Sequence, residues 1–209
     1  MGWRRFLWTA PAGIARMEDS SLISHEVYSP DIAGVLIPRH RIAARLDELA
    51  RSITEAYPGG ELTILAALTG SLVFLSDLIR RLPLRLRVDV VRVSSYPHEA
   101  TASREPSVLI APGGDLPGRH VLVIDDILDS GKTLELIRGL AMEAGAASVR
   151  TCVLLAKRRD DLPGRVAADF TGFEIDDQFV VGYGLDWGDL YRNLPDVCLL
   201  RNLEGRTGR

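Results

Sequence analysis

The stretch Val121–Thr133 reads VLVIDDILDSGKT and combines a strand with two adjacent carboxylates. Residues 121–124 are the apolar run that a buried strand needs, and Asp125 and Asp126 come where this strand emerges at its carboxyl end. Two carboxylates at such a place would repel one another and lose hydration unless they meet hydrogen-bond donors or a metal ion. Ribose hydroxyls or a magnesium ion would supply both. The pair therefore predicts a site for a sugar or a metal.

The second half of this stretch predicts a phosphate-binding loop. Asp129, Ser130, Gly131, Lys132 and Thr133 lead into the start of a helix. Backbone N–H groups at a helix start form an anion site, the glycine allows close approach, and the two hydroxyl groups add donors. Carboxylates followed by such a loop indicate a site for a phosphorylated sugar.

Other acidic or glycine-containing loops fit this stretch less well. A Walker A loop needs a glycine five positions before Gly131, where Asp126 stands, and a Walker B element fails without that loop. A phosphorylation-controlled receiver domain carries its acidic pair near the domain start, whereas only 83 residues follow Asp126. A surface loop with scattered charges explains the ordered pattern poorly.

Apolar strands and amphipathic helices alternate along the chain. We expect helices at 39–57, 71–82 and 132–144, and strands at 62–68, 86–96, 107–111, 120–124, 148–157, 178–181 and 197–200. The alternation predicts an α/β fold with a mostly parallel central sheet, helices on both faces and a small hood from the chain ends. Residues 31–209 would form one domain, with ligands at the carboxyl ends of the strands.

The composition excludes several classes of protein. The 209 residues are 46% hydrophobic, which suffices for one core, and no segment approaches the ~20 apolar residues of a membrane span. A net charge of -3 without long runs of one sign does not indicate binding to nucleic acid. Cys152 and Cys198 lie in apolar runs, and the four histidines share no ligand-like spacing. We therefore expect a reducing, cytoplasmic location and no zinc site.

Residues 1–30 are expected to be a disordered or variable leader. The first residues, MGWRRFLWTAPAGIARMED, faintly resemble a secretory signal. However, the apolar run from Phe6 to Ala15 is short and is broken by Pro11 and Gly13. An upstream start ahead of Met17 would explain the segment equally well.

Taken together, these motifs resemble the type I phosphoribosyltransferases. VLVIDDILDSGKT is similar to the signature that binds phosphoribosyl pyrophosphate (PRPP) in that family. Over residues 33–202 the chain resembles the hypoxanthine-guanine branch, through VLIPRHRIAARLDELARSI, LTGSLVFLSDLIRRL, SSY, LLAKR and FVVGYGLD. The resemblance implies purine salvage, in which the 5-phosphoribosyl group moves from PRPP to N9 of hypoxanthine or guanine. IMP or GMP and pyrophosphate would be the products, and Mg²⁺ the cofactor.

The resemblance also implies which residues bind PRPP. Asp125 and Asp126 would hold the ribose hydroxyls directly or through Mg²⁺, and residues 129–133 would bind the 5′-phosphate. Asp129 would also lie near purine N7, as general acid or base. Asp186 would ligate a second Mg²⁺. Pyrophosphate would meet Arg192 and the backbone amides of Leu68, Thr69, Gly70 and Ser71. A mobile loop with Ser95 and Tyr96 would close over the reacting centre.

The base pocket is implied to consist of Lys157, Phe179, Val180 and Asp186. A lysine ammonium group can only donate, so Lys157 suits the oxygen at C6 of hypoxanthine or guanine and mismatches the amino group of adenine. Phe179 offers a face for stacking, with core packing as the alternative. The backbone of Val180 and of residues near Asp186 would meet the Watson–Crick edge.

Three residues depart from the family pattern. Thr69 stands where the family commonly has a basic residue, so affinity for pyrophosphate falls if charge matters there. Trp187 stands where tyrosine is familiar, and Gly188 adds flexibility, so base preference is open.

Two alternatives remain at this point. A regulator could keep the PRPP fold and bind nucleotides or RNA without catalysis, although Asp129 and the acidic net charge argue against it. A transferase could instead prefer xanthine, adenine or a pyrimidine. The usual oligomers of the family imply a homodimer or homotetramer.

Overall fold

The computed structural model describes residues 30–94, 107–110, 113–159, 161–162 and 165–201. The predicted leader up to Ser29 and the predicted mobile loop with Ser95 and Tyr96 lie outside these residues. The elements follow one another as β1 (Ile32–Ile37), α1 (Arg39–Ala56), β2 (Glu61–Leu68), α2 (Leu72–Ile79), β3 (Arg85–Ser94), β4 (Ser107–Ile110), β5 (His120–Leu128), α3 (Lys132–Glu143), β6 (Ser148–Lys157), β7 (Phe170–Ile175), β8 (Val180–Val181) and β9 (Val197–Leu200).

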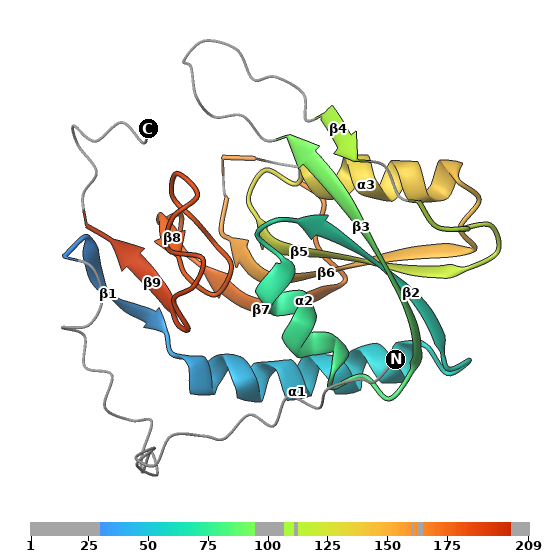
Figure 1. The fold of residues 1–209 in the computed structure, drawn as a ribbon, viewed down its shortest axis with the longest axis horizontal. Coiled ribbons are helices and arrows are strands. Elements are labelled where there is room, and N and C mark those ends of the chain that lie inside the picture. Colours follow the sequence, from blue (N-terminus) through green and yellow to red (C-terminus); the bar gives the residue numbers. More distant parts are fainter. Residues whose placement is uncertain (1–29, 95–106, 111–112, 160, 163–164, 202–209) are drawn as a thin grey trace, which may run out of the picture.

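The central sheet has the strand order β4-β3-β2-β5-β6-β7 (Figure 1). Five neighbouring strands, β3, β2, β5, β6 and β7, run parallel to one another. At one edge of the sheet, β4 pairs antiparallel with β3. The continuous apolar runs of β2, β5 and β6 are buried because both faces of the sheet are covered. The predicted α/β fold with a mostly parallel sheet is confirmed.

Two helices cover one face of this sheet and one helix covers the other. Alternate residues of β2 face opposite ways, so Ile64 and Ala66 join the core under α1 and α2, while Leu65 and Ala67 join the core under α3. Figure 1 shows α1 and α2 together on one side of the sheet and α3 on the other. The apolar stripe of α1 is the one that its helical spacing predicts: Ile42, Leu46, Leu49, Ala50 and Ile53.

A second, small sheet joins segments from both ends of the described chain, as predicted for the hood. Its order is β1-β9-β8, and both pairings are antiparallel. The buried Asp196, just before β9, accepts a hydrogen bond from the backbone N–H of Arg39 at 2.6 Å and forms an ion pair with its guanidinium. This contact fixes the hood to the start of α1. Across the described ranges, we find no helix with the length and apolar character of a membrane span.

Several strand boundaries differ from the predicted ones, and three of these differences lie near the site. β5 continues to Leu128, because it stays paired with β6 as far as Ala156. The acidic pair therefore lies within the paired part of β5 and not after it. β7 was not expected from its residues, because Gly172 interrupts its apolar pattern. A side-chain Cβ at Gly172 would lie only 2.4 Å from the carbonyl oxygen of Leu154, so the glycine lets β7 approach β6. β8 is shorter than expected and consists of Val180–Val181.

Candidate active site

Asp125 and Asp126 form an acidic pair near the carboxyl end of β5, with Asp125 buried and Asp126 half-buried. Asp125 is 7% exposed, its Oδ1 accepts the backbone N–H of Asp126 at 2.9 Å, and Asp126 accepts that of Ile127 at 2.9 Å. Burial raises the pKa of both carboxyl groups, and the neighbouring charge of Asp126 raises the pKa of Asp125 further. The pair is therefore costly to ionise and suited to a ligand that brings donors or positive charge.

The loop after β2 lies directly against this pair. A Cβ built on Gly70 would stand 1.8 Å from Oδ2 of Asp126, so only glycine fits there without displacing the carboxylate. The hydroxyl of the buried Ser71 donates to the carbonyl oxygen of Ala67 at 2.5 Å. The hydroxyl is therefore engaged within the loop, and the binding of an anion by the backbone amides of 68–71 stays a prediction. The Leu68–Thr69 peptide bond is cis.

The segment after β8 reaches the same loop from the hood. Gly184, at φ +100°, packs so closely that a Cβ there would lie 2.1 Å from the carbonyl oxygen of Gly70. Arg192 donates to the carbonyl oxygen of Gly184 at 2.9 Å and pairs with Asp186 at 2.8 Å. Its charge partly offsets the raised pKa of Asp126. The structure thus brings Asp126, Gly70, Asp186 and Arg192 together.

The predicted phosphate loop joins β5 to α3. Gly131 has φ 87°, a left-handed conformation that favours glycine, and α3 begins at the next residue. Gly131 is buried while Ser130 and Lys132 are exposed, so the open side of the loop faces away from the core. The amides at the start of α3 can therefore meet an anion, as the sequence predicts for this loop.

Two cations face the carboxylate of Asp129. Arg159 Nη1 lies 2.5 Å from its Oδ1, and Lys157 Nζ lies 3.3 Å from its Oδ2. Arg165 donates to the backbone carbonyl oxygen of Asp129 at 2.8 Å. The structure therefore places the lysine predicted for the base pocket beside the aspartate predicted for proton transfer.

Lys157 and Phe179 have different environments. The Lys157 side chain is only 12% exposed and pairs with Asp177 at 2.8 Å, and this hydrogen bond lowers the pKa of Asp177. Phe179 is 50% exposed, so core packing is not its role, and its ring has a face available for stacking. Val180 follows in the buried strand β8, where its backbone pairs with Leu199.

The departures at Trp187 and Gly188 lie in a tight turn. Trp187 and Leu190 exchange backbone hydrogen bonds at 3.2 Å, and Gly188 and Asp189 between them have φ of 60° and 62°. Two successive positive φ values suit a two-residue hairpin turn. Gly188 was expected to add flexibility, but its conformation serves a defined turn.

Three residues of the site were missed by the sequence interpretation: Arg159, Arg165 and Asp177. Arg159 follows Lys157 by two positions, and no role was predicted for it. Asp177 follows β7, and β7 ends beside Lys157 because Lys157 pairs with Ile175. Assigning β7 would have revealed Asp177, whereas nothing local marks Arg165 as a neighbour of Asp129.

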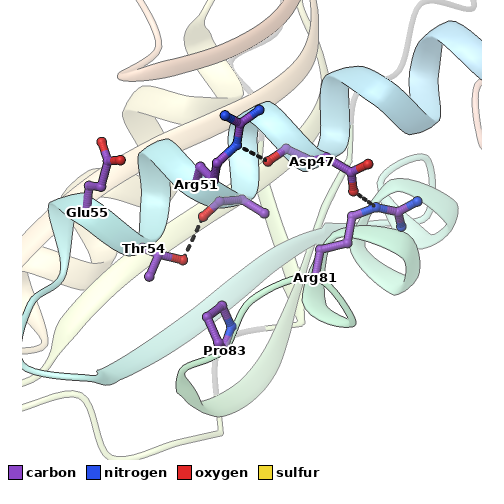
Figure 2. Close-up of a pocket in the computed structure, with 7 residues that line it drawn as sticks. Asp47, Arg51, Thr54, Glu55, Arg81 and Pro83 are labelled. Carbon is purple, nitrogen blue, oxygen red and sulfur yellow. Dashed lines mark hydrogen bonds and ion pairs between the residues drawn. The ribbon is translucent and has the colours of Figure 1, made fainter.

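Two further features of the described residues concern metal binding and a cavity away from the site. The described part of the chain contains no group of three or more His, Cys, Asp or Glu residues that could hold a metal ion by itself. A cavity of about 530 Å³ lies between α1 and the connection from α2 to β3 (Figure 2). Arg81 pairs with Asp47 at its edge at 2.8 Å, and none of the predicted site residues lines it.

Comparison with known proteins gives one consistent result. Residues 36–187 match the phosphoribosyl transferase domain family. The hypoxanthine phosphoribosyltransferase of Salmonella typhimurium is 39% identical over 168 residues, which cover 78% of this chain and 92% of the relative. The hypoxanthine-guanine phosphoribosyltransferase of Bacillus subtilis is 37% identical over 174 residues, covering 82% and 94%.

Solved structures agree with these relatives. A hypoxanthine-guanine phosphoribosyltransferase of Bacillus anthracis superposes with a TM-score of 0.75 at 31% identity, covering 82% of this chain and 99% of that one. A mutant hypoxanthine phosphoribosyltransferase of Trypanosoma cruzi, complexed with the product IMP, gives 0.75 at 32% identity, covering 83% and 93%.

Proposed function

The chain belongs to the phosphoribosyltransferase family, in its hypoxanthine-guanine branch, and from this premise we propose that it acts in purine salvage. It transfers the 5-phosphoribosyl group of PRPP to N9 of hypoxanthine or guanine and releases pyrophosphate. The observation that carries the proposal is the 3.3 Å ion pair between Lys157 and Asp129. That pair joins a donor suited to a 6-oxopurine to the start of the phosphate loop.

PRPP is bound, in this proposal, along the carboxyl ends of β2 and β5. The amides of 129–133 hold the 5′-phosphate at the start of α3, and Asp125 and Asp126 accept hydrogen bonds from the ribose hydroxyls. Pyrophosphate lies by the loop at Gly70 and within reach of Arg192. The contacts that support this arrangement are the close approach of Gly70 to Asp126 and of Gly184 to Gly70.

The purine binds beside PRPP with its oxygen toward Lys157. Lys157 donates a hydrogen bond to the oxygen at C6, and the exposed ring of Phe179 stacks on the base. Adenine has an amino group at C6, so the buried ammonium group of Lys157 would face another donor. The site therefore rejects adenine. Xanthine shares the oxygen at C6, so the same contact admits it.

The reaction exchanges one bond at C1′ of the ribose. N9 of the purine attacks as the bond to pyrophosphate breaks, and the bonding electrons leave with pyrophosphate. Arg192 offsets the charge that grows on that leaving group. Asp129 accepts a proton from the purine, near N7, as positive charge develops on the base.

Magnesium fits the carboxylate oxygens of this site. Mg²⁺ is held in proteins by one or two carboxylates together with substrate oxygens, and the adjacent carboxylates of Asp125 and Asp126 offer such oxygens. Asp186 would join a second ion once Arg192 turns from it toward pyrophosphate. When bound, Mg²⁺ neutralises negative charge on the pyrophosphate.

The proposal is tested by incubating the protein with PRPP and Mg²⁺ and with hypoxanthine, guanine, xanthine or adenine in turn. Nucleotide formation with the 6-oxopurines supports it, and their relative rates decide between hypoxanthine, guanine and xanthine. Binding of PRPP without conversion of any base would indicate a nucleotide-binding regulator instead. The proposal includes a cytoplasmic homo-oligomer, and the free, buried thiols of Cys152 and Cys198 support a reducing compartment.

A further inference from the structure

Two arginines that follow Lys157 in the chain, Arg159 and Arg165, contact Asp129. From their geometry we infer that Arg159 is a positioning residue, which holds the Asp129 carboxylate so that its second oxygen faces the purine. This inference rests on the proposed function, because it assigns a role within the transfer reaction. It adds a residue that the family signature in 121–133 does not contain.

The two oxygens of Asp129 have different partners. Nη1 of Arg159 donates a short, charge-assisted hydrogen bond to Oδ1. Oδ2 lies 3.3 Å from Nζ of Lys157, which is a looser contact. Since Arg159 holds the first oxygen firmly, the second is the one left to take a proton from the base.

Arg159 is itself fixed by a second carboxylate. Asp161 accepts from Nε at 2.8 Å and from Nη2 at 2.9 Å, so the planar guanidinium is held along one edge by two bonds while Nη1 donates to Asp129. These hydrogen bonds lower the pKa of Asp161, with the bond from Arg159 as the first cause. A lysine has one ammonium group and cannot hold both carboxylates in this way.

The backbone under Asp129 is held from the same segment. Arg165 donates to its carbonyl oxygen at 2.8 Å, and the Cγ of Arg165 would lie 3.3 Å from a Cβ at Gly131. The carboxylate and the backbone of Asp129 are thus restrained by different arginines. Of these two arginines, only Arg159 contacts a carboxylate oxygen of Asp129, so its removal loosens the carboxylate without freeing the loop.

Arg158 provides a matched control. It is the adjacent arginine, its side chain is 59% exposed, and it pairs at 2.8 Å with Asp176. It makes no described contact with Asp129, so Arg158→Ala removes the same charge from the same segment and leaves the Asp129 carboxylate in place. Arg159→Lys keeps the charge and removes the fork.

The test measures kcat and KM for hypoxanthine and PRPP in Arg159→Ala, Arg159→Lys and Arg158→Ala, and repeats Arg159→Ala in an Asp129→Asn background. We expect Arg159→Ala to lower kcat about tenfold, since misplacing a catalytic group by a fraction of an ångström costs one to two orders of magnitude. KM for PRPP should stay within about twofold, Arg159→Lys should recover part of the loss, and Arg158→Ala should match the wild type. In the Asp129→Asn background Arg159→Ala should change kcat by less than about twofold, because the effect passes through Asp129.

Several results would overturn the inference. An equal loss of kcat in the Asp129→Asn background would show that Arg159 acts independently of Asp129. A higher kcat/KM for hypoxanthine in Arg159→Ala would show that the ion pair blocks the site. A wild-type protein that converts no base would refute the proposed function and this inference with it, whereas an active wild type with an unchanged Arg159→Ala would refute the inference alone.

Discussion

Gly70 is the position where one added methyl group tests the geometry of the site. In Gly70→Ala the new Cβ would stand 1.8 Å from Oδ2 of Asp126, far inside an ordinary contact. Carbon and oxygen atoms in contact lie roughly 3.4–4 Å apart, so the carboxylate or the loop must move by more than 1 Å. Displacement of this size costs on the order of a hundredfold in rate, or about 2.7 kcal/mol of transition-state stabilisation.

The assay is the rate of IMP formation at limiting PRPP, together with the thermal midpoint of unfolding. We expect kcat/KM for PRPP to fall about a hundredfold in Gly70→Ala, with the fold retained because the collision is with a side chain. Gly59→Ala is the control, since a Cβ there would have no neighbour within 4 Å. A Gly70→Ala enzyme with kcat/KM within threefold of the wild type would refute the placement of this loop against the acidic pair.

Further expectations concern the acidic pair, the base pocket and α3. Asp125→Asn should abolish transfer yet raise the melting temperature of the ligand-free protein at pH 7. Burial raises the pKa of Asp125, so the folded state binds this proton more tightly than the unfolded state does. The stability of the wild type therefore falls as pH rises above the ordinary pKa of 3.8. The stabilisation should vanish below that pH, and a thermal shift that is independent of pH would contradict the reasoning. Lys157→Ala should raise KM for hypoxanthine more than KM for PRPP, and the reverse order would place Lys157 outside the base pocket. Gly139→Ala should stabilise the protein by about 0.5–1 kcal/mol in chemical denaturation with unchanged kcat, because a Cβ there meets no atom within 4 Å and alanine favours α3; a destabilised variant would count against this.

The local parts of the site were predictable from the sequence. The apolar run of β5, the acidic pair and the start of α3 are consecutive, so their order in the chain sets their geometry. Gly131 is an example. The residue before α3 is in the left-handed conformation, with φ of 87°, and glycine adopts that conformation readily. The same local logic gave α1 to within one residue of its observed end at Ala56.

Contacts between distant segments were harder to predict. The close approach of Gly70 to both Asp126 and Gly184 depends on how three strand ends meet at one edge of the sheet, and no local pattern records it. The ion pair of Lys157 with Asp177 depends on β7, whose short apolar pattern Gly172 interrupts. Sequence patterns predict such partners only after the strand that carries them has been assigned.

Charged side chains in the loop after β6 were the least predictable. Arg158 and Arg159 are neighbours of the same type, and both could be solvated on composition alone. In the structure Arg158 remains 59% exposed while Arg159 is 21% exposed and faces Asp129. What separates them is the direction of each side chain where β6 ends, which follows from tertiary structure.

The most direct test of the account compares hypoxanthine with adenine as acceptors, by measuring kcat/KM for nucleotide formation with PRPP and Mg²⁺. A buried donor at Lys157 should favour hypoxanthine over adenine by about 10⁴-fold, since a site built to hydrogen-bond one group rejects an analogue that leaves it unpaired. A ratio within about tenfold, or transfer to adenine alone, would contradict the assignment of Lys157 and with it the proposed 6-oxopurine site.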